Sequence, residues 1–234
     1  MKTFVTGASR GIGLAICREL ARQGHDLLMV AKNPDILKKS AAAVQAIGKT
    51  KVSFLPADLT NPNSLKAIRT FVQKNKKGLC NLVLNAGIAL EGGLKSGSRK
   101  IFEKQMELHL YSVFGLVQTL LPYLDHTQPC RIVITGSSAG LEASHVVPMY
   151  SVTKWALRGY AVNLRNELKK DGVAVTYMAP GATYTDIWKY RGGPKPERLI
   201  APEDIAKMVA AILSLSGRCD VEEVLIRPML GELH

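Results

Sequence analysis

The sequence predicts a doubly wound α/β domain, with a seven-stranded parallel sheet and helices on both of its faces. Short apolar runs of strand length alternate with longer segments of helical periodicity along the chain. A glycine-rich turn, Gly7–Gly13, follows the first apolar run directly. The 234 residues contain no repeat and no interdomain linker. We therefore expect a single domain over residues 1–234.

Each predicted strand is a short run of mainly apolar residues. The strands are expected at Thr3–Thr6, Asp26–Ala31, Lys51–Pro56, Leu82–Asn85, Arg131–Thr135, Ala174–Ala179 and Glu223–Ile226. The helices are expected at Gly11–Gln23, Asp35–Ile47, Asn63–Lys76, Arg99–Leu124, Met149–Lys170 and Pro202–Leu215. In such a sheet the ligand lies at the carboxyl ends of the strands, where the strand order reverses.

The composition of the chain indicates in which part of the cell the protein is expected and in which state its cysteines are. Hydrophobic residues make up 47% of the chain, enough for a packed core, and no apolar run approaches the roughly 20 residues of a membrane span. The N-terminus has no signal-peptide pattern, so we expect a cytoplasmic protein without a membrane partner. The four cysteines form no Cys-x-x-Cys pair, which predicts free thiols and no metal site.

The net charge of +12 is the unusual bulk property. An acidic partner such as nucleic acid is one interpretation of it. However, the basic residues are dispersed, and the densest clusters, Lys74–Lys77 and Lys169–Lys170, fall where helices should end. No helix–turn–helix or zinc motif is present, so a solvated basic surface is favoured over nucleic-acid binding.

The glycine-rich turn is the first candidate binding element. It reads Thr6-Gly7-Ala8-Ser9-Arg10-Gly11-Ile12-Gly13, between a strand and a helix. Glycine permits a tight turn and close backbone approach to a phosphate, and the helix N-terminus attracts an anion. This placement predicts a nucleotide site in a Rossmann-type fold.

Motifs further along the chain are more specific. They are Thr6-Gly7-x3-Gly11-x-Gly13, Asn85-Ala86-Gly87, Ser137, Tyr150-x3-Lys154 and Pro180-Gly181. In this order and approximate spacing, the sequence resembles the short-chain dehydrogenase/reductase family, in its compact single-domain branch. By general appearance it is nearest to the 3-oxoacyl-acyl-carrier-protein reductases. The resemblance covers the chain from end to end.

The residues after the second strand bear on the choice of nicotinamide cofactor. Binders of NAD place an acidic residue there for the ribose, whereas a basic residue suits the 2′-phosphate of NADP. Here the strand is followed by Lys32, and Arg10 lies in the glycine-rich turn. The pair predicts NADP(H), although either residue alone is also explained as a surface charge.

The resemblance implies further cofactor contacts. Asp58 matches a position that meets the adenine amino group, although a capping role explains it nearly as well. Asn85-Ala86-Gly87 matches a turn that lines the cofactor and supports the sheet. The remaining cofactor positions implied by the family are Gly7, Ser9, Gly11, Ile12, Gly13, Tyr150, Lys154, Pro180, Gly181, Thr183 and Thr185.

Three residues are predicted to carry the chemistry. Tyr150 and Lys154 are four residues apart on one predicted helix and therefore share a face. An ammonium beside a phenol is expected to lower its pKa, which suits Tyr150 as general acid in reduction and general base in oxidation. Ser137 closes the fifth strand and is expected to donate to the substrate oxygen. Ser138 is the adjacent rival, but the family's spacing favours Ser137.

One position departs from the family pattern. The family usually has an asparagine in the long helix before the fifth strand, where it links the lysine to solvent through water. The matching residue here is His109, which is able to hold a water and to titrate near neutral pH. The alternative is that His109 only packs within its helix.

The main prediction is therefore a reductase of ketones, aldehydes or 3-oxoacyl thioesters, whose substrate is a small molecule or a carrier-bound acyl chain. A non-catalytic NADP-sensing protein is the alternative, but it would not need Ser137, Tyr150 and Lys154. Segment Trp188–Ile200 matches the family's mobile substrate loop. The resemblance also implies a homodimer or homotetramer, built on the two long helices.

Overall fold

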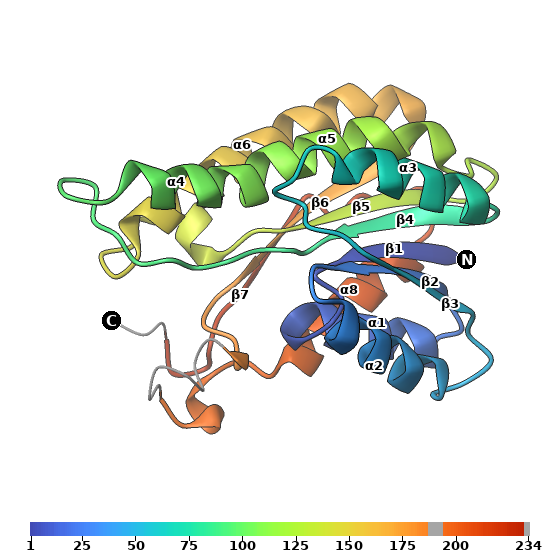
Figure 1. The fold of residues 1–234 in the computed structure, drawn as a ribbon, viewed down its shortest axis with the longest axis horizontal. Helices are drawn as coiled ribbons and strands as arrows, with labels where there is room; N and C mark the ends of the chain where they lie inside the picture. The colour runs from blue at the N-terminus through green and yellow to red at the C-terminus, as the bar shows by residue number, and fades with distance from the viewer. Residues whose placement is uncertain (187–193, 232–234) are drawn as a thin grey trace.

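The computed structural model describes residues 1–186 and 194–231, which form a parallel sheet between two layers of helices (Figure 1). The strands are β1 (Lys2–Thr6), β2 (Asp26–Ala31), β3 (Val52–Pro56), β4 (Leu79–Leu84), β5 (Cys130–Thr135), β6 (Val173–Pro180) and β7 (Glu223–Ile226). Their order is β3-β2-β1-β4-β5-β6-β7, and every neighbouring pair is parallel. The predicted doubly wound, seven-stranded Rossmann-type sheet is confirmed.

The helices match the predicted ones closely. They are α1 (Gly11–Arg22), α2 (Pro34–Gln45), α3 (Ser64–Asn75), α4 (Arg99–Met106), α5 (Ser112–Leu120), α6 (Pro148–Leu168) and α8 (Pro202–Ser214). The long helix expected at Arg99–Leu124 is α4 and α5 joined by a π-helical turn, Glu107–Tyr111, and followed by a 3₁₀ turn, Leu121–Tyr123. None of the helices in the described ranges is long and apolar enough to cross a lipid bilayer.

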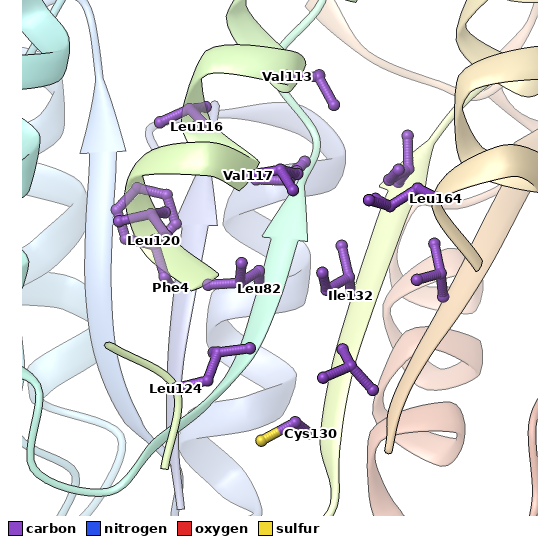
Figure 2. Close-up of a cluster of buried hydrophobic side chains, with 14 of the residues drawn as sticks. Phe4, Leu82, Val113, Leu116, Val117, Leu120, Leu124, Cys130, Ile132 and Leu164 are labelled. Carbon is purple, nitrogen blue, oxygen red and sulfur yellow. The ribbon is translucent and has the colours of Figure 1, made fainter. Parts of the chain in front are cut away.

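Alternating side chains of the sheet feed two hydrophobic cores. Phe4 and Leu82 pack with α3, α5 and α6 on one face, and Figure 2 shows the middle of this core, including Leu116 and Ile132. Val5 and Val83, one residue further on in the same strands, pack with α1, α2 and α8 on the other face. The strands are therefore apolar on both sides, as expected of a covered parallel sheet.

The predicted strand boundaries are within one residue of those in the structure, except for the start of the fourth strand. The fourth strand begins at Leu79, three residues before the expected Leu82. The polar residue Asn81 lies in the part of the strand that the apolar pattern did not include. Asn81 is fully buried, and its side-chain amide donates to the Thr3 hydroxyl on β1 at 3.4 Å. A polar residue with a buried partner fits inside a strand, which periodicity alone does not reveal.

The strand order reverses between β1 and β4, since the chain runs outward through β2 and β3 and then returns to the other side of β1. The carboxyl ends of β1 and β4 therefore border the crevice in which a doubly wound sheet binds its ligand. The described cysteines are free thiols, with Cys17, Cys80 and Cys130 buried and Cys219 exposed.

Candidate active site

The turn after β1 has the backbone shape that the glycines were predicted to allow. Gly7 and Gly11 have φ of 63° and 54°, in the left-handed region that glycine tolerates. A Cβ on Gly13 would lie 2.3 Å from the Gly7 carbonyl oxygen, so α1 packs against the turn more closely than any side chain permits. α1 begins directly after this turn, at the carboxyl end of β1, so the unpaired backbone amides of its first turn are available to an anion there.

The predicted turn after β4 holds the glycine-rich turn and the start of α1 in place. The backbone amides of Asn85 and Ala86 donate to the Thr6 hydroxyl at 2.9 and 3.1 Å, and the Asn85 side-chain amide donates to the Thr6 carbonyl at 3.2 Å. These bonds tie the ends of β1 and β4 together at the reversal point. Thr6 is the acceptor of all three bonds, a role that its place in the glycine motif did not reveal.

The other residues predicted in the glycine-rich turn have different environments. Arg10 is exposed at the position before α1 and makes no side-chain cap within the described residues. Ser9 is buried, and its carbonyl accepts from the Ser40 hydroxyl at 2.8 Å. Ile12 is partly buried against the core under α1. Arg10 is thus the member of the turn with a cation open to a ligand.

Lys32 and Asp58 lie together at the ends of β2 and β3. The Lys32 Nζ is 2.7 Å from the Asp58 carboxylate, and the lysine side chain is 76% exposed. Asp58 also accepts from the Thr60 backbone amide and hydroxyl at 3.0 and 2.8 Å. Partial burial raises the pKa of Asp58, but the bonds from Lys32 and Thr60 outweigh it and lower that pKa overall. Asp58 thus closes a turn with Thr60 ahead of α3, whose N-cap is Asn63, and forms an ion pair with Lys32 that the sequence did not suggest.

The segment after β6 comes back to the glycine-rich turn. Gly181 follows β6, and its amide donates to the Ile226 carbonyl at 2.7 Å. The Thr183 hydroxyl donates to the Gly181 carbonyl at 2.9 Å, and Thr183 pairs with Ile200 in an isolated bridge. A Cβ on Gly11 would lie 3.2 Å from the Thr185 methyl carbon, so Thr185 closes over the start of α1.

Pro180 is the last residue of β6, so the predicted segment Pro180–Thr185 borders the crevice. Of the predicted substrate loop, residues 188–193 lie outside the described residues. Residues 194–200 are described, and they end in the pairing with Thr183.

Ser137, Tyr150 and Lys154 meet at the carboxyl end of β5. Ser137 follows that strand and caps a 3₁₀ turn, with its hydroxyl accepting from the Ala139 amide at 3.2 Å. Tyr150 lies in the first turn of α6, and the Ser137 side chain is close enough to it to lower the pKa of its hydroxyl. The Lys154 Nζ lies 5.5 Å from the centre of the Tyr150 ring and donates to the Thr135 carbonyl at 3.1 Å.

The electrostatics of this group differ from the expectation. Burial raises the pKa of Tyr150 to about 12, opposed only by the bond to Ser137. Burial also lowers the pKa of Lys154 to about 7. The prediction that Lys154 lowers the pKa of Tyr150 is therefore wrong for this structure, because removal from water dominates both groups. A Tyr150 hydroxyl that keeps its proton at neutral pH is suited to donating it.

His109 is also buried beside Lys154, but it does not behave as predicted. Burial first, and the nearby Lys154 charge second, lower its pKa to about 2. The interpretation of His109 as a group that titrates near neutral pH is thus contradicted. Its ring meets that of Tyr150 edge-on, with centroids 5.4 Å apart at 88°.

The hydrogen bonds of His109 fix its tautomer. Its Nε2 accepts from the Ile88 amide at 3.1 Å, so the ring proton is on Nδ1. Nδ1 is 2.7 Å from the Thr153 hydroxyl, which itself donates to the Tyr150 carbonyl at 2.7 Å. The π-helical turn thus presents a neutral imidazole that connects the turn after β4 with the first turn of α6.

Replacing His109 should change how stability depends on pH. Its folded pKa, about 2, is far below the ordinary value of 6.5. As the pH falls below 6.5, the unfolded chain takes up a proton that the folded chain refuses, so the free energy of unfolding decreases. Between these limits the loss is about 1.4 kcal/mol per pH unit.

The measurement is urea unfolding of wild type and His109→Asn at pH values from about 7 to about 5. We expect wild type to lose about 2 kcal/mol more than the variant over this range, since other titrating groups are common to both. Parallel curves for the two proteins would contradict a neutral, buried His109.

Comparison with known proteins agrees with this fold. Residues 2–194 match the family described as short chain dehydrogenase. The chain therefore belongs to the short chain dehydrogenase family of oxidoreductases.

Individual relatives are similar over nearly their full length. Sepiapterin reductase of Chlorobaculum tepidum is 27% identical over 238 residues, covering 99% of this chain and 97% of that protein. An alcohol dehydrogenase from the archaeon Thermococcus sibiricus, solved with 5-hydroxy-NADP, has a TM-score of 0.90 at 27% identity, covering 100% of this chain and 98% of that one. A short chain dehydrogenase from Burkholderia cenocepacia, solved with NADP, has a TM-score of 0.83 at 26% identity, covering 96% and 95%.

Proposed function

We propose that the protein is an NADPH-dependent oxidoreductase that reduces a small carbonyl compound to an alcohol. The observation that carries the proposal is the meeting of Ser137, Tyr150 and Lys154 at one place: the Lys154 Nζ lies 5.5 Å from the Tyr150 ring, and the Ser137 side chain is close enough to lower the pKa of Tyr150. This group lies at the carboxyl end of β5. Because the strands are parallel, that is the same edge of the sheet as the ligand crevice between β1 and β4. A proton donor and an oxyanion donor side by side are what carbonyl reduction requires.

The glycine-rich turn supports a dinucleotide cofactor, since Gly7, Gly11 and Gly13 let its backbone approach a phosphate closely at the N-terminus of α1. Arg10, at the N-cap of α1, and Lys32, which follows β2 and pairs with Asp58, supply two exposed cations near the position at which the 2′-phosphate distinguishes NADP from NAD. The relatives solved with NADP or its 5-hydroxy derivative support the same choice.

In this proposal the bound nicotinamide supplies a hydride to the carbonyl carbon. Tyr150 transfers its proton to the carbonyl oxygen, and Ser137 donates a hydrogen bond to that oxygen while negative charge develops on it. The Lys154 ammonium is held at the end of β5 by its hydrogen bond to the Thr135 carbonyl. The family resemblance also assigns this ammonium a bond to the nicotinamide ribose. His109 and Thr153 hold the backbone of Tyr150 in place.

A cavity of about 310 Å³ is lined by the residues that lead into α6 just before Tyr150, and a volume of this size suits a small substrate. Glu91, Gly92 and Gly93 line it from the segment after β4, and residues 145–148 line it from the segment that leads into α6. The walls combine a carboxylate and an imidazole with two valines and a proline. The two relatives described above, a sepiapterin reductase and an alcohol dehydrogenase, support a small substrate, whereas the thioester alternative is supported by the sequence resemblance.

The test is the consumption of NADPH, followed by absorbance, with sepiapterin, simple ketones and aldehydes, sugar ketones and an acetoacetyl thioester. Turnover with at least one of them, and much weaker turnover with NADH, is the expected result. Tight NADPH binding without turnover on the whole panel would instead favour the cofactor-sensing alternative.

Removing the cations should change cofactor choice selectively. A charge-assisted hydrogen bond contributes about 1.5–3 kcal/mol, so Lys32→Ala or Arg10→Ala should raise the KM for NADPH about tenfold or more. The KM for NADH should stay within about twofold, because it has no 2′-phosphate. Lys38→Ala, at an exposed lysine of α2, is the matched control. An equal rise for both cofactors would contradict this assignment.

We also propose that two copies associate through α4, α5 and α6, as the family resemblance implies. These helices leave large apolar side chains exposed: Tyr111 precedes α5, Phe114 lies on it, and Val152 and Trp155 lie on α6. Burying such groups between copies is favourable. Light scattering after gel filtration tests this, and a monomer at micromolar concentration would overturn it.

A further inference from the structure

Tyr177 lies on β6, directly beneath the active site, and no family motif led to it. Its side chain is completely buried. Its hydroxyl donates to the Lys154 carbonyl on α6 at 3.2 Å and accepts from the Ser137 amide at 3.4 Å. One phenol therefore joins the backbones of two residues that carry the proposed chemistry.

Two glycines leave room for this ring. A Cβ on Gly136 would lie 2.0 Å from the Tyr177 Cζ, and a Cβ on Gly140 would lie 2.1 Å from its hydroxyl oxygen. Because the ring is enclosed, it has no space into which to move. Neither glycine has a positive φ, so close packing rather than backbone conformation requires glycine: against Tyr177 at Gly136, and against both Tyr177 and the Lys154 carbonyl at Gly140.

We propose that Tyr177 is a positioning residue, which holds Ser137 at the end of β5 in register with Tyr150 and Lys154 on α6. The inference rests on the proposed function. Ser137 is contributed by a turn after a strand and Tyr150 by a helix, so their separation depends on what packs between those elements. Tyr177 occupies that place, and its hydroxyl contacts both sides.

The groups that face Tyr150 come from four elements, one of which is the turn after β5 that carries Ser137. Lys154 is on its own helix, His109 is on the π-helical turn, and Tyr177 is on β6. Ser137 is the group whose hydrogen bond lowers the pKa of Tyr150. If Ser137 drifts, that bond weakens and the pKa of Tyr150 rises further.

The experiment is Tyr177→Phe, which keeps the ring and removes only the bridging hydroxyl. Tyr160→Phe on α6 is the control, because Tyr160 packs against Phe114 and away from the site. We expect kcat per NADPH-binding site to fall about tenfold, because a small displacement of a reacting group is costly, while the KM and Kd for NADPH stay within about twofold. The pH profile of alcohol oxidation should move to higher pH.

Counting sites by NADPH titration separates positioning from poor folding, since misfolded protein binds no cofactor. A variant that loses stability but keeps wild-type kcat per site and the wild-type pH profile would overturn the inference and leave the proposed function intact. If wild type binds NADPH but reduces no substrate, the proposed function is overturned and this inference with it.

Discussion

Tyr150→Phe is expected to lower kcat for carbonyl reduction by about a hundredfold or more, because a positioned proton donor contributes roughly 10²- to 10⁴-fold. The substitution removes only the hydroxyl. The ring that meets His109 edge-on at 5.4 Å is retained, so the variant should fold with its crevice intact. NADPH binding should change little compared with kcat.

The protonation state of Tyr150 gives this prediction a direction. With a pKa raised to about 12, the hydroxyl holds its proton at neutral pH and is ready to donate it in reduction. Oxidation needs the deprotonated form, so wild-type oxidation should rise with pH while reduction does not. Tyr160→Phe on the same helix should match wild type in both directions. A Tyr150→Phe enzyme with more than a tenth of wild-type kcat would show that the proton comes from elsewhere.

Much of the fold was predictable because its signals are local. The strand–turn–helix pattern at Thr6–Gly13 and the alternation of runs yield the sheet without any knowledge of contacts. The spacing of Tyr150 and Lys154 likewise places both on one face of α6. These inferences depend on residues near each other in the chain, where periodicity is informative.

What the sequence did not reveal depends on burial and on distant partners. The pKa of Tyr150 and of His109 depends on how much water the fold removes, which no spacing encodes. Tyr177 was missed because its partners, Ser137 and Lys154, are 40 and 23 residues away. Gly136 and Gly140, on either side of the predicted site residue Ser137, were the available signal, since residues without a side chain there leave room for a large neighbour.

Gly13→Ala is the second substitution with a large expected effect. The new methyl group would lie 2.3 Å from the Gly7 carbonyl oxygen and 2.7 Å from the Asn85 side-chain nitrogen. Both belong to the hydrogen-bonded turns that join β1 to β4, so neither is free to withdraw. We expect a loss of about 1–3 kcal/mol in the free energy of unfolding, together with a large loss of NADPH affinity.

Gly159→Ala provides the matched control, because Gly159 lies on α6 with no atom within 4 Å of the position its Cβ would take. Alanine is favoured over glycine in a helix by up to about 1 kcal/mol, so this variant should be as stable as wild type or more so. Urea unfolding and NADPH fluorescence titration measure both effects. The free energy of unfolding is expected to fall for Gly13→Ala and to stay the same or rise for Gly159→Ala. This difference distinguishes the effect of close packing near Gly7 from the effect of helix propensity. If Gly13→Ala bound NADPH as wild type does, α1 must be able to move away from the turn without loss. The proposal that the close contact between Gly13 and Gly7 shapes the NADPH site would then be wrong.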